Sequence, residues 1–168
     1  NIAIHGFTPI ILKPLIDLDI DYYNLISAEI EQVYQKFKID IDTKAAFSQK
    51  FYANIFANAR DILESPGILP LKNIFSNIPV VVVSAGPSLD KNIGLIRSAR
   101  KRIIVLTVAT ALKPLLRNGI EPDIVIAIDP NDETIQSFSI EKIPERLWLV
   151  FDPCIPPEIN NFFKSQKI

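Results

Sequence analysis

The residues with the clearest chemical potential form a short turn, Ser84-Ala85-Gly86-Pro87-Ser88-Leu89, which directly follows four consecutive valines. A buried strand, a turn containing glycine and a helix together collect backbone N–H groups at the helix N-terminus, and this arrangement holds anions such as phosphate. Gly86 lets a ligand approach the backbone, Pro87 stiffens the turn, and Ser88 offers a hydroxyl group at the helix start. The stretch predicts the first strand–helix turn of a nucleotide-type site, although the same residues would also make an ordinary tight turn.

Polar residues follow three further predicted strands: Thr110, Asp129 with Asp132, and Asp152. Thr110 could hydrogen bond to a ribose or a base. Asp129 and Asp132 could accept hydrogen bonds from ribose hydroxyls or bind Mg²⁺ beside a phosphate. Asp129 could equally cap the end of its strand, and we expect Asp152 to be structural. If the strands are parallel, all these groups meet at the carboxyl edge of the sheet, where open α/β sheets bind ligands.

The sequence lacks the usual motifs of several other kinds of nucleotide-binding, metal-binding and catalytic site. The sequence contains neither GxxxxGK[ST] nor GxGxxG, so a P-loop NTPase is excluded and a standard dinucleotide fold is disfavoured. One histidine, His5, and one cysteine, Cys154, cannot build the usual zinc site, and a single cysteine excludes an intramolecular disulfide. No serine–histidine pair indicates acyl transfer. We therefore expect no dedicated metal site, and we interpret His5 as a surface or partly buried side chain.

Short strands and helices alternate in the second half of the chain. Apolar runs predict strands over 80–83, 103–109, 124–128 and 147–151, and periodicity predicts helices over 89–100, 111–118 and 157–164. This alternation predicts an α/β fold, Rossmann-like and three-layered, with a mostly parallel sheet and right-handed crossovers. The valine run is expected to be buried on both faces. Pro114 is expected in the first turn of its helix, which leaves 110–112 outside it.

An α-helical N-terminal region is expected before the sheet. Apolar residues at three- and four-residue steps predict helices over 22–38 and 43–64, the second capped by Thr43, and a short helix over 69–76. The expected domains are a lead-in and helical region over 1–76 and a Rossmann-like nucleotide-binding domain over 77–168, truncated at its C-terminus. The aromatic helices offer a surface through which two copies could form a homo-oligomer.

Composition narrows the class of protein. The chain has 168 residues, a net charge of −1, 48% apolar and 22% charged residues, which is typical of a soluble globular protein. No basic tail suggests nucleic acid, and no apolar run reaches the ~20 residues that span a bilayer. We expect no nucleic-acid or membrane partner and a cytoplasmic location. The absence of methionine suggests a piece of a longer protein.

Two stretches, VVVVSAGPSLDKNIGLI and VLTVATALKPLLRNGIEPDIVIAIDP, resemble the domain shared by motility-associated-factor (Maf) glycosyltransferases and archaeal 6-hydroxymethylpterin diphosphokinases, the MptE-like family. The resemblance covers about residues 51–153. It implies a nucleotide-binding domain in which a Maf-type enzyme transfers a nonulosonic acid, such as pseudaminic acid, from a CMP donor to Ser/Thr of flagellin. It places Thr110 and Asp129 near the ribose, base or sugar. It places five residues at the nucleotide phosphate or ribose: Ala85, Gly86, Pro87, Ser88 and Leu89.

The family's other branch implies different chemistry at the same edge. A pterin diphosphokinase-like enzyme would hold ATP there, with Asp129 as a Mg²⁺ ligand. The long helical region favours the Maf branch, because the archaeal enzyme is more compact. A sialyltransferase-like reaction wants a downstream general base, often histidine, and no histidine follows Ser84. We therefore expect this chain to bind a nucleotide without the complete catalytic apparatus. A further alternative is a non-catalytic interaction module that docks through residues 22–64.

Overall fold

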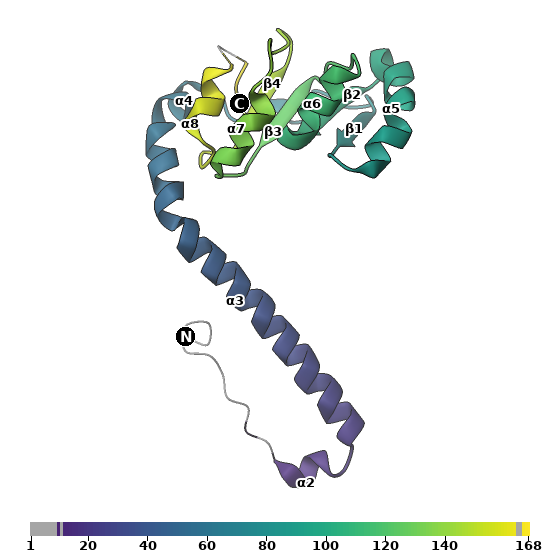
Figure 1. Ribbon diagram of the computed structural model, residues 1–168, viewed down its shortest axis with the longest axis vertical. Coiled ribbons are helices and arrows are strands. Elements are labelled where there is room, and N and C mark those ends of the chain that lie inside the picture. Colours follow the sequence, from purple (N-terminus) through teal and green to yellow (C-terminus); the bar gives the residue numbers. More distant parts are fainter. Residues whose placement is uncertain (1–9, 11, 164–165) are drawn as a thin grey trace. The chain divides into compact units, whose positions relative to one another are not determined.

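A computed structural model describes residues 10, 12–163 and 166–168, so His5 lies outside the described residues. The chain forms two compact units, Asn1–Ser48 and Gln49–Ile168. The first contains α2 (Lys13–Ile16) and most of α3 (Ile20–Ala57). The second contains the end of α3, the sheet and its helices (Figure 1). The second unit includes residues 49–64, of which Asn54 and Asn58 hydrogen bond to residues 153–155.

The helix α3 is one continuous helix of 38 residues, where the sequence predicted two. Residues 39–42 contain neither glycine nor proline, and an ion pair of 2.7 Å between Lys44 Nζ and Asp40 Oδ2 supports this turn. Thr43 therefore lies inside the helix instead of capping it. The helix α3 ends at Ala57, and α4 (Ala59–Glu64) begins after Asn58.

Four parallel strands form the sheet: β1 (Val80–Val83), β2 (Ile104–Val108), β3 (Ile124–Ala127) and β4 (Trp148–Phe151), in the order β1-β2-β3-β4. The last described residues, 166–168, run parallel to β4 and pair with it at Leu149 and Lys167. The α/β class, the parallel sheet and the α-helical N-terminal region are confirmed. Apolar β-branched residues dominate the strands, as expected for a parallel sheet.

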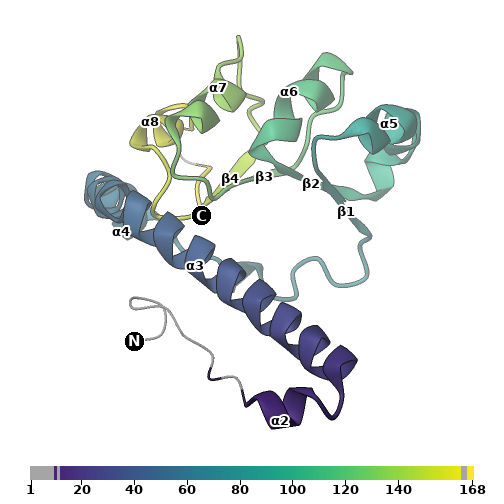
Figure 2. The same ribbon diagram turned by 60° about the horizontal axis from the view of Figure 1, so that its bottom comes forward.

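The crossover helices are α5 (Pro87–Ala99), α6 (Ala109–Arg117) and α7 (Ile135–Phe138), and α8 (Pro157–Asn161) follows β4. Figure 2 shows α5, α6 and α7 on the same side of the sheet. Right-handed crossovers between strands in sequential order put every helix on one face. The core lies between this face and the helices, where Val105, Val125, Leu112, Leu115 and Phe138 are fully buried.

The opposite face of the sheet carries exposed apolar residues. Val80 is 46%, Val82 67% and Trp148 41% exposed. The expectation that the valine run is buried on both faces is therefore wrong: β1 is an edge strand, and the crossover helices cover one face only. The sheet and its crossovers thus build two layers. A cavity of about 510 Å³ lies on the open face. Residues of the 66–75 segment and of the strand starts line it, among them Phe75, Ile124 and Trp148.

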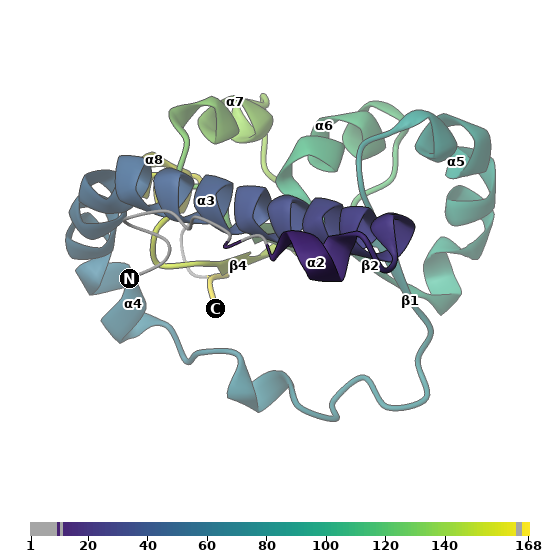
Figure 3. The same cartoon turned by 90° about the horizontal axis from the view of Figure 1, so that it is seen from below.

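Two segments differ locally from the prediction. Residues 65–79 contain only a 3-10 turn, η1 (Leu69–Leu71), in place of a helix over 69–76, and run as an irregular connection from α4 to β1 (Figure 3). Asn73 and Asn77 both adopt a φ of 67° there, a conformation that asparagine tolerates but a helix does not. The helix α6 begins at Ala109, so residues 110–112 are helical despite Pro114. Burial of that turn in the core offsets the hydrogen bond that proline cannot donate.

Candidate functional site

The turn between β1 and α5 lies at the carboxyl edge of the sheet, as predicted. Gly86 precedes the first helical residue, Pro87, with φ 172° and ψ 168°, which is extended backbone. Pro87 suits this position because its missing N–H would have no helical partner. Ser84 to Ser88 are exposed, and Ser88 opens the first turn of a 13-residue helix. Leu89 differs from its neighbours: its side chain is buried in the core, and its N–H donates to the Gly86 carbonyl at 2.9 Å.

A second helix begins at the same edge. The helix α6 follows β2 without a loop, and Thr110 is exposed in its first turn. Among the described residues, neither α5 nor α6 receives a side-chain cap at its N-terminus. Because β1 and β2 are neighbouring parallel strands, two uncapped helix N-termini follow adjacent strand ends. First-turn N–H groups and the helix dipole both attract anions, so this corner of the sheet is suited to a phosphate group.

The aspartates that end β3 and β4 form matching turns. Asp129 Oδ1 accepts a hydrogen bond of 2.9 Å from the Asn131 N–H, and Asp152 Oδ1 accepts one of 2.9 Å from the Cys154 N–H. These are Asx turns, in which the carboxylate holds its own loop. Both aspartates are exposed. Asp129 is thus both a strand-end cap and an exposed acceptor. The structure places Asp129 at the same edge as Ser88 and Thr110, two strands from β1.

Three buried asparagines form a group beside the turn after β4, and sequence reasoning missed them. Asn54 Nδ2 also lies 3.5 Å from the carbonyl oxygen of Pro130, in the turn after β3. Asn54 Nδ2 donates to the Cys154 carbonyl at 2.7 Å, and Asn58 Nδ2 donates to the carbonyls of Pro153 at 3.0 Å and Ile155 at 2.8 Å. Asn160 Nδ2 completes the group by donating to Asn58 Oδ1 at 2.9 Å. We name Asn54, Asn58 and Asn160 the asparagine clamp. The sequence signal for this clamp is a pair of asparagines, Asn54 and Asn58, four residues apart in an otherwise aromatic and apolar helical segment.

An ion pair adds a further link between α3 and the loop after β3. Lys50 Nζ lies 2.8 Å from Asp132 Oδ1, at the start of η3 (Asp132–Thr134). Asp132 was a candidate acceptor for ribose or Mg²⁺, and the structure gives its carboxylate a cationic partner instead. The end of α3 thus contacts both loops that follow β3 and β4.

The single cysteine belongs to this region but is not a nucleophile. Burial, and after it the neighbouring Asp152 carboxylate, raises the pKa of the Cys154 thiol to about 12. Only the thiolate attacks electrophiles, so the folded chain keeps Cys154 protonated at neutral pH. We expect a disulfide reagent at pH 8 to label Cys154 at least tenfold more slowly in the folded chain than in urea, as followed by absorbance. Equal rates would show that the thiol is open to solvent.

Two cavities lie away from this edge. A cavity of about 740 Å³ lies between the C-terminal end of α6 and the segment before β4, which is the amino edge of the sheet, and Lys113, Arg117 and Arg146 are among its lining residues. Neither this cavity nor the one on the open face includes Gly86, Ser88, Thr110 or Asp129. Within the described residues, no group of three or more His, Cys, Asp or Glu side chains is arranged to hold a metal ion.

The fold and this edge define an α/β domain of the Rossmann-like class, with two helices that begin after neighbouring parallel strands. The chain belongs to the 6-hydroxymethylpterin diphosphokinase MptE-like family, because the model of that family matches residues 53–168. The MptE-like resemblance inferred from the sequence is thus confirmed. Within the described residues, no helix combines the length and hydropathy needed to cross a membrane.

Two individual proteins are similar to parts of the chain. An uncharacterized protein of Treponema pallidum (strain Nichols) is 30% identical over 99 residues, which are 59% of this chain and 46% of that protein. The chain therefore spans about half the length of this relative. A solved structure of a MAf glycosyltransferase from Magnetospirillum magneticum AMB-1 matches 54% of this chain and 15% of that one, with 21% identity and a TM-score of 0.46.

Proposed function

We propose that the carboxyl edge of the sheet binds a nucleoside phosphate, and that the chain is the donor-binding part of a nucleotide-dependent transferase in the cytoplasm. One observation carries this proposal: α5 and α6 both begin, without side-chain caps in the described part of the chain, after the neighbouring strands β1 and β2. Their first turns offer N–H groups to one phosphate. The residues proposed to face the phosphate are Ala85, Gly86, Pro87 and Ser88, with Leu89 supporting the turn from the core.

The position of Asp129 favours a nucleotide over free phosphate. Neighbouring strands lie about 4.8 Å apart, so the loop after β3 is roughly 10 Å from the loop after β1. A ligand with its phosphate at α5 and a ribose or base directed toward β3 would cross this distance. Thr110 lies between the two ends and offers a hydroxyl group. Asp129, held by its Asx turn, keeps exposed carboxylate oxygens as acceptors for ribose hydroxyls.

For the donor, we propose a CMP-activated nonulosonic acid, as in Maf-type glycosyltransferases, with flagellin Ser/Thr as the acceptor. The AGPSLDKN stretch and the 38-residue helix α3 ahead of the sheet support this choice. In this proposal the chain binds the donor, and other parts of the protein supply the catalytic base. A second candidate is an ATP-dependent pterin diphosphokinase, which the description of the matching family favours. In that case Asp129 would bind Mg²⁺ beside the phosphates of ATP.

Calorimetric titration of the chain with CMP, CDP and ATP, each with and without Mg²⁺, tests the proposal. We expect CMP and CDP to bind without Mg²⁺ and ATP to bind about tenfold more weakly. Tighter, Mg²⁺-dependent binding of ATP, with consumption of 6-hydroxymethyl-dihydropterin, would select the diphosphokinase. No binding of any of the three by a folded chain would contradict the nucleotide site itself, and would leave the interaction module as the remaining alternative.

A further inference from the structure

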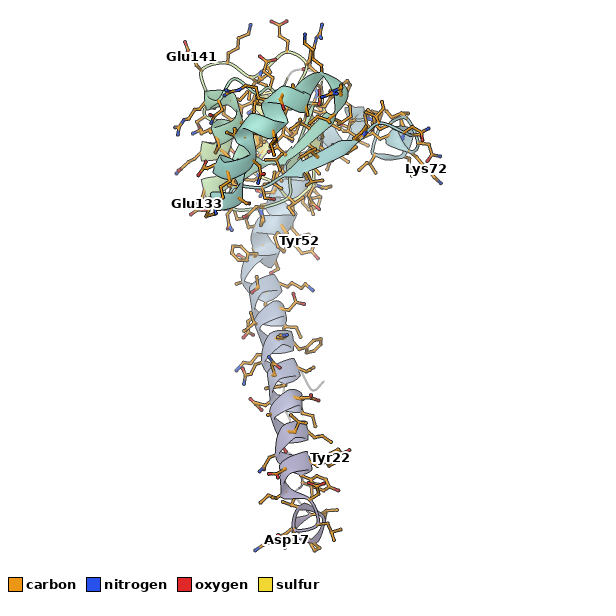
Figure 4. All side chains as sticks on the ribbon, turned by 90° about the vertical axis from the view of Figure 1, so that its right-hand side faces the viewer. Asp17, Tyr22, Tyr52, Lys72, Glu133 and Glu141 are labelled. Atoms are coloured by element: carbon orange, nitrogen blue, oxygen red, sulfur yellow. The ribbon has the colours of Figure 1, made fainter. Side chains whose placement is uncertain are left out.

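The first half of α3 carries an apolar stripe whose spacing is that of a coiled coil. Tyr23, Ile26, Ile30, Val33 and Phe37 follow one another at alternating three- and four-residue steps, the a and d positions of a heptad. Ile30 is 48%, Val33 67% and Phe37 52% exposed, and Tyr23 and Ile26 are half-buried. Figure 4 shows the side chains of α3 projecting from the helix, Tyr22 among them. Such a seam is typical of a helix that pairs with another helix of the same period.

We propose that the segment 19–44 pairs with the same segment of a second copy of this chain, as an antiparallel coiled coil. In the register that centres the apolar positions, Ile30 faces Val33 of the second copy, and Ile26 faces its Phe37. By two-fold symmetry each contact occurs twice. The centre of the seam is then four apolar layers. This register follows from the heptad positions alone. It also predicts which residues of the two copies meet at the outer positions of the seam.

The outer positions of this register are chemically complementary. Tyr23 faces Asp40 of the second copy, so that the phenol can donate a hydrogen bond to the carboxylate. Further out, Asp19, which caps α3 by accepting from the Tyr22 N–H at 3.0 Å, faces Lys44. On one flank of the seam, Glu29 faces Lys36. Opposite charges thus meet in the seam, at Asp19 and Lys44, and on its flank, at Glu29 and Lys36. Such charge pairs determine which partner a coiled-coil helix binds and in which orientation.

The same residues argue against a parallel pair. In a parallel, in-register dimer each a or d residue meets its own copy, so Asp40 would face Asp40 and Lys44 would face Lys44 at the seam. Like charges at these positions oppose association. In the antiparallel pair, Lys44 keeps its 2.7 Å ion pair with Asp40 of its own helix and gains Asp19 of the second copy. Charge complementarity therefore favours an antiparallel second copy of the chain as the partner that covers this apolar stripe.

Sedimentation equilibrium of the whole chain tests the proposal, with circular dichroism to confirm helix content. We expect a dimer for the wild type and a monomer for Ile30→Asp, which places two carboxylates at the centre of the seam. Glu29→Lys turns two attractive contacts into repulsive ones and should raise the dimer Kd about tenfold. Adding Lys36→Glu to it should restore the wild-type Kd. Glu31→Lys, on the outer side of the helix, is the matched control and should leave Kd unchanged.

Cysteine cross-linking tests the orientation. In a Cys154→Ser background, an Ile26→Cys chain mixed with a Phe37→Cys chain should form a mixed disulfide dimer. Neither variant alone should cross-link, because like positions lie far apart in an antiparallel pair. A wild-type chain that is monomeric at the highest concentration reached would overturn the proposal. So would cross-linking of Ile26→Cys to itself, or failure of Lys36→Glu to rescue Glu29→Lys.

Discussion

Gly86→Val is expected to abolish nucleotide binding while the Tm of the chain stays unchanged. The backbone at Gly86 is extended, with φ 172° and ψ 168°, which a valine adopts without strain. A Cβ built there meets no atom within 4 Å, so the fold has room for the side chain. A bound phosphate would occupy that room, because it must approach the N-terminus of α5. We expect a loss of about a hundredfold or more in affinity, measured by calorimetry with the nucleotide that the wild type binds.

Because the backbone at Gly86 is extended and not left-handed, this substitution separates ligand binding from folding. The matched control is Gly94→Ala, which lies within α5, the helix that follows Gly86, and is also in open space. It should leave affinity unchanged and stabilise α5 by about 0.5–1 kcal/mol, since alanine is the better helix former. If the Gly86→Val chain folds and binds the nucleotide with wild-type affinity, the ligand does not bind at this turn.

Asn58→Ala is expected to lower the free energy of unfolding by about 3 kcal/mol. The Asn58 side chain is fully buried and donates to the carbonyls of Pro153 and Ile155. It also accepts the hydrogen bond of Asn160. Alanine would leave these buried groups unpaired and open a cavity, and each unpaired group costs free energy. Urea denaturation, compared between variant and wild type at constant m-value, measures the loss.

Asn118→Ala provides the control for this prediction. Its Nδ2 also donates to a carbonyl, that of Pro114 at 2.9 Å, but the side chain is exposed, so water replaces the lost contact. We expect a change within about 0.5 kcal/mol. If Asn58→Ala cost no more than Asn118→Ala, the asparagine clamp would not be what holds the loop after β4. Circular dichroism of both variants at low denaturant separates local loosening of this loop from general unfolding.

The positions of the strands and the convergence of loops at one edge could be predicted because they depend on local signals. Runs of valine, isoleucine and leucine indicate strands, and the glycine and proline of SAGPSL and the Asp-Pro pairs mark where the strands end. Once the strands are parallel, topology alone brings Ser88, Thr110 and Asp129 to the same edge. These parts of the candidate site required no knowledge of distant contacts.

The remaining features depend on contacts across the chain. The asparagine clamp joins residues about a hundred positions apart, and nothing in a helical asparagine says which carbonyl it will meet. The exposure of Val82 follows from the edge position of β1 and from helices that all lie on one face, whereas its sequence is that of a buried strand. The helix α7 has four residues, too few to show a period, yet its Phe138 is fully buried.

The asparagine clamp also constrains how the protein can change in length. A helix turns by about 100° with each residue, so one residue inserted between Asn54 and Asn58 would swing one amide away from its carbonyls. The loop after β4, to which both amides donate, would lose part of its support. Insertions ahead of residue 49 would instead leave both amides in place, because both asparagines follow the insertion point and stay in the unit of the sheet. The helix can therefore change in length ahead of the clamp but not within it.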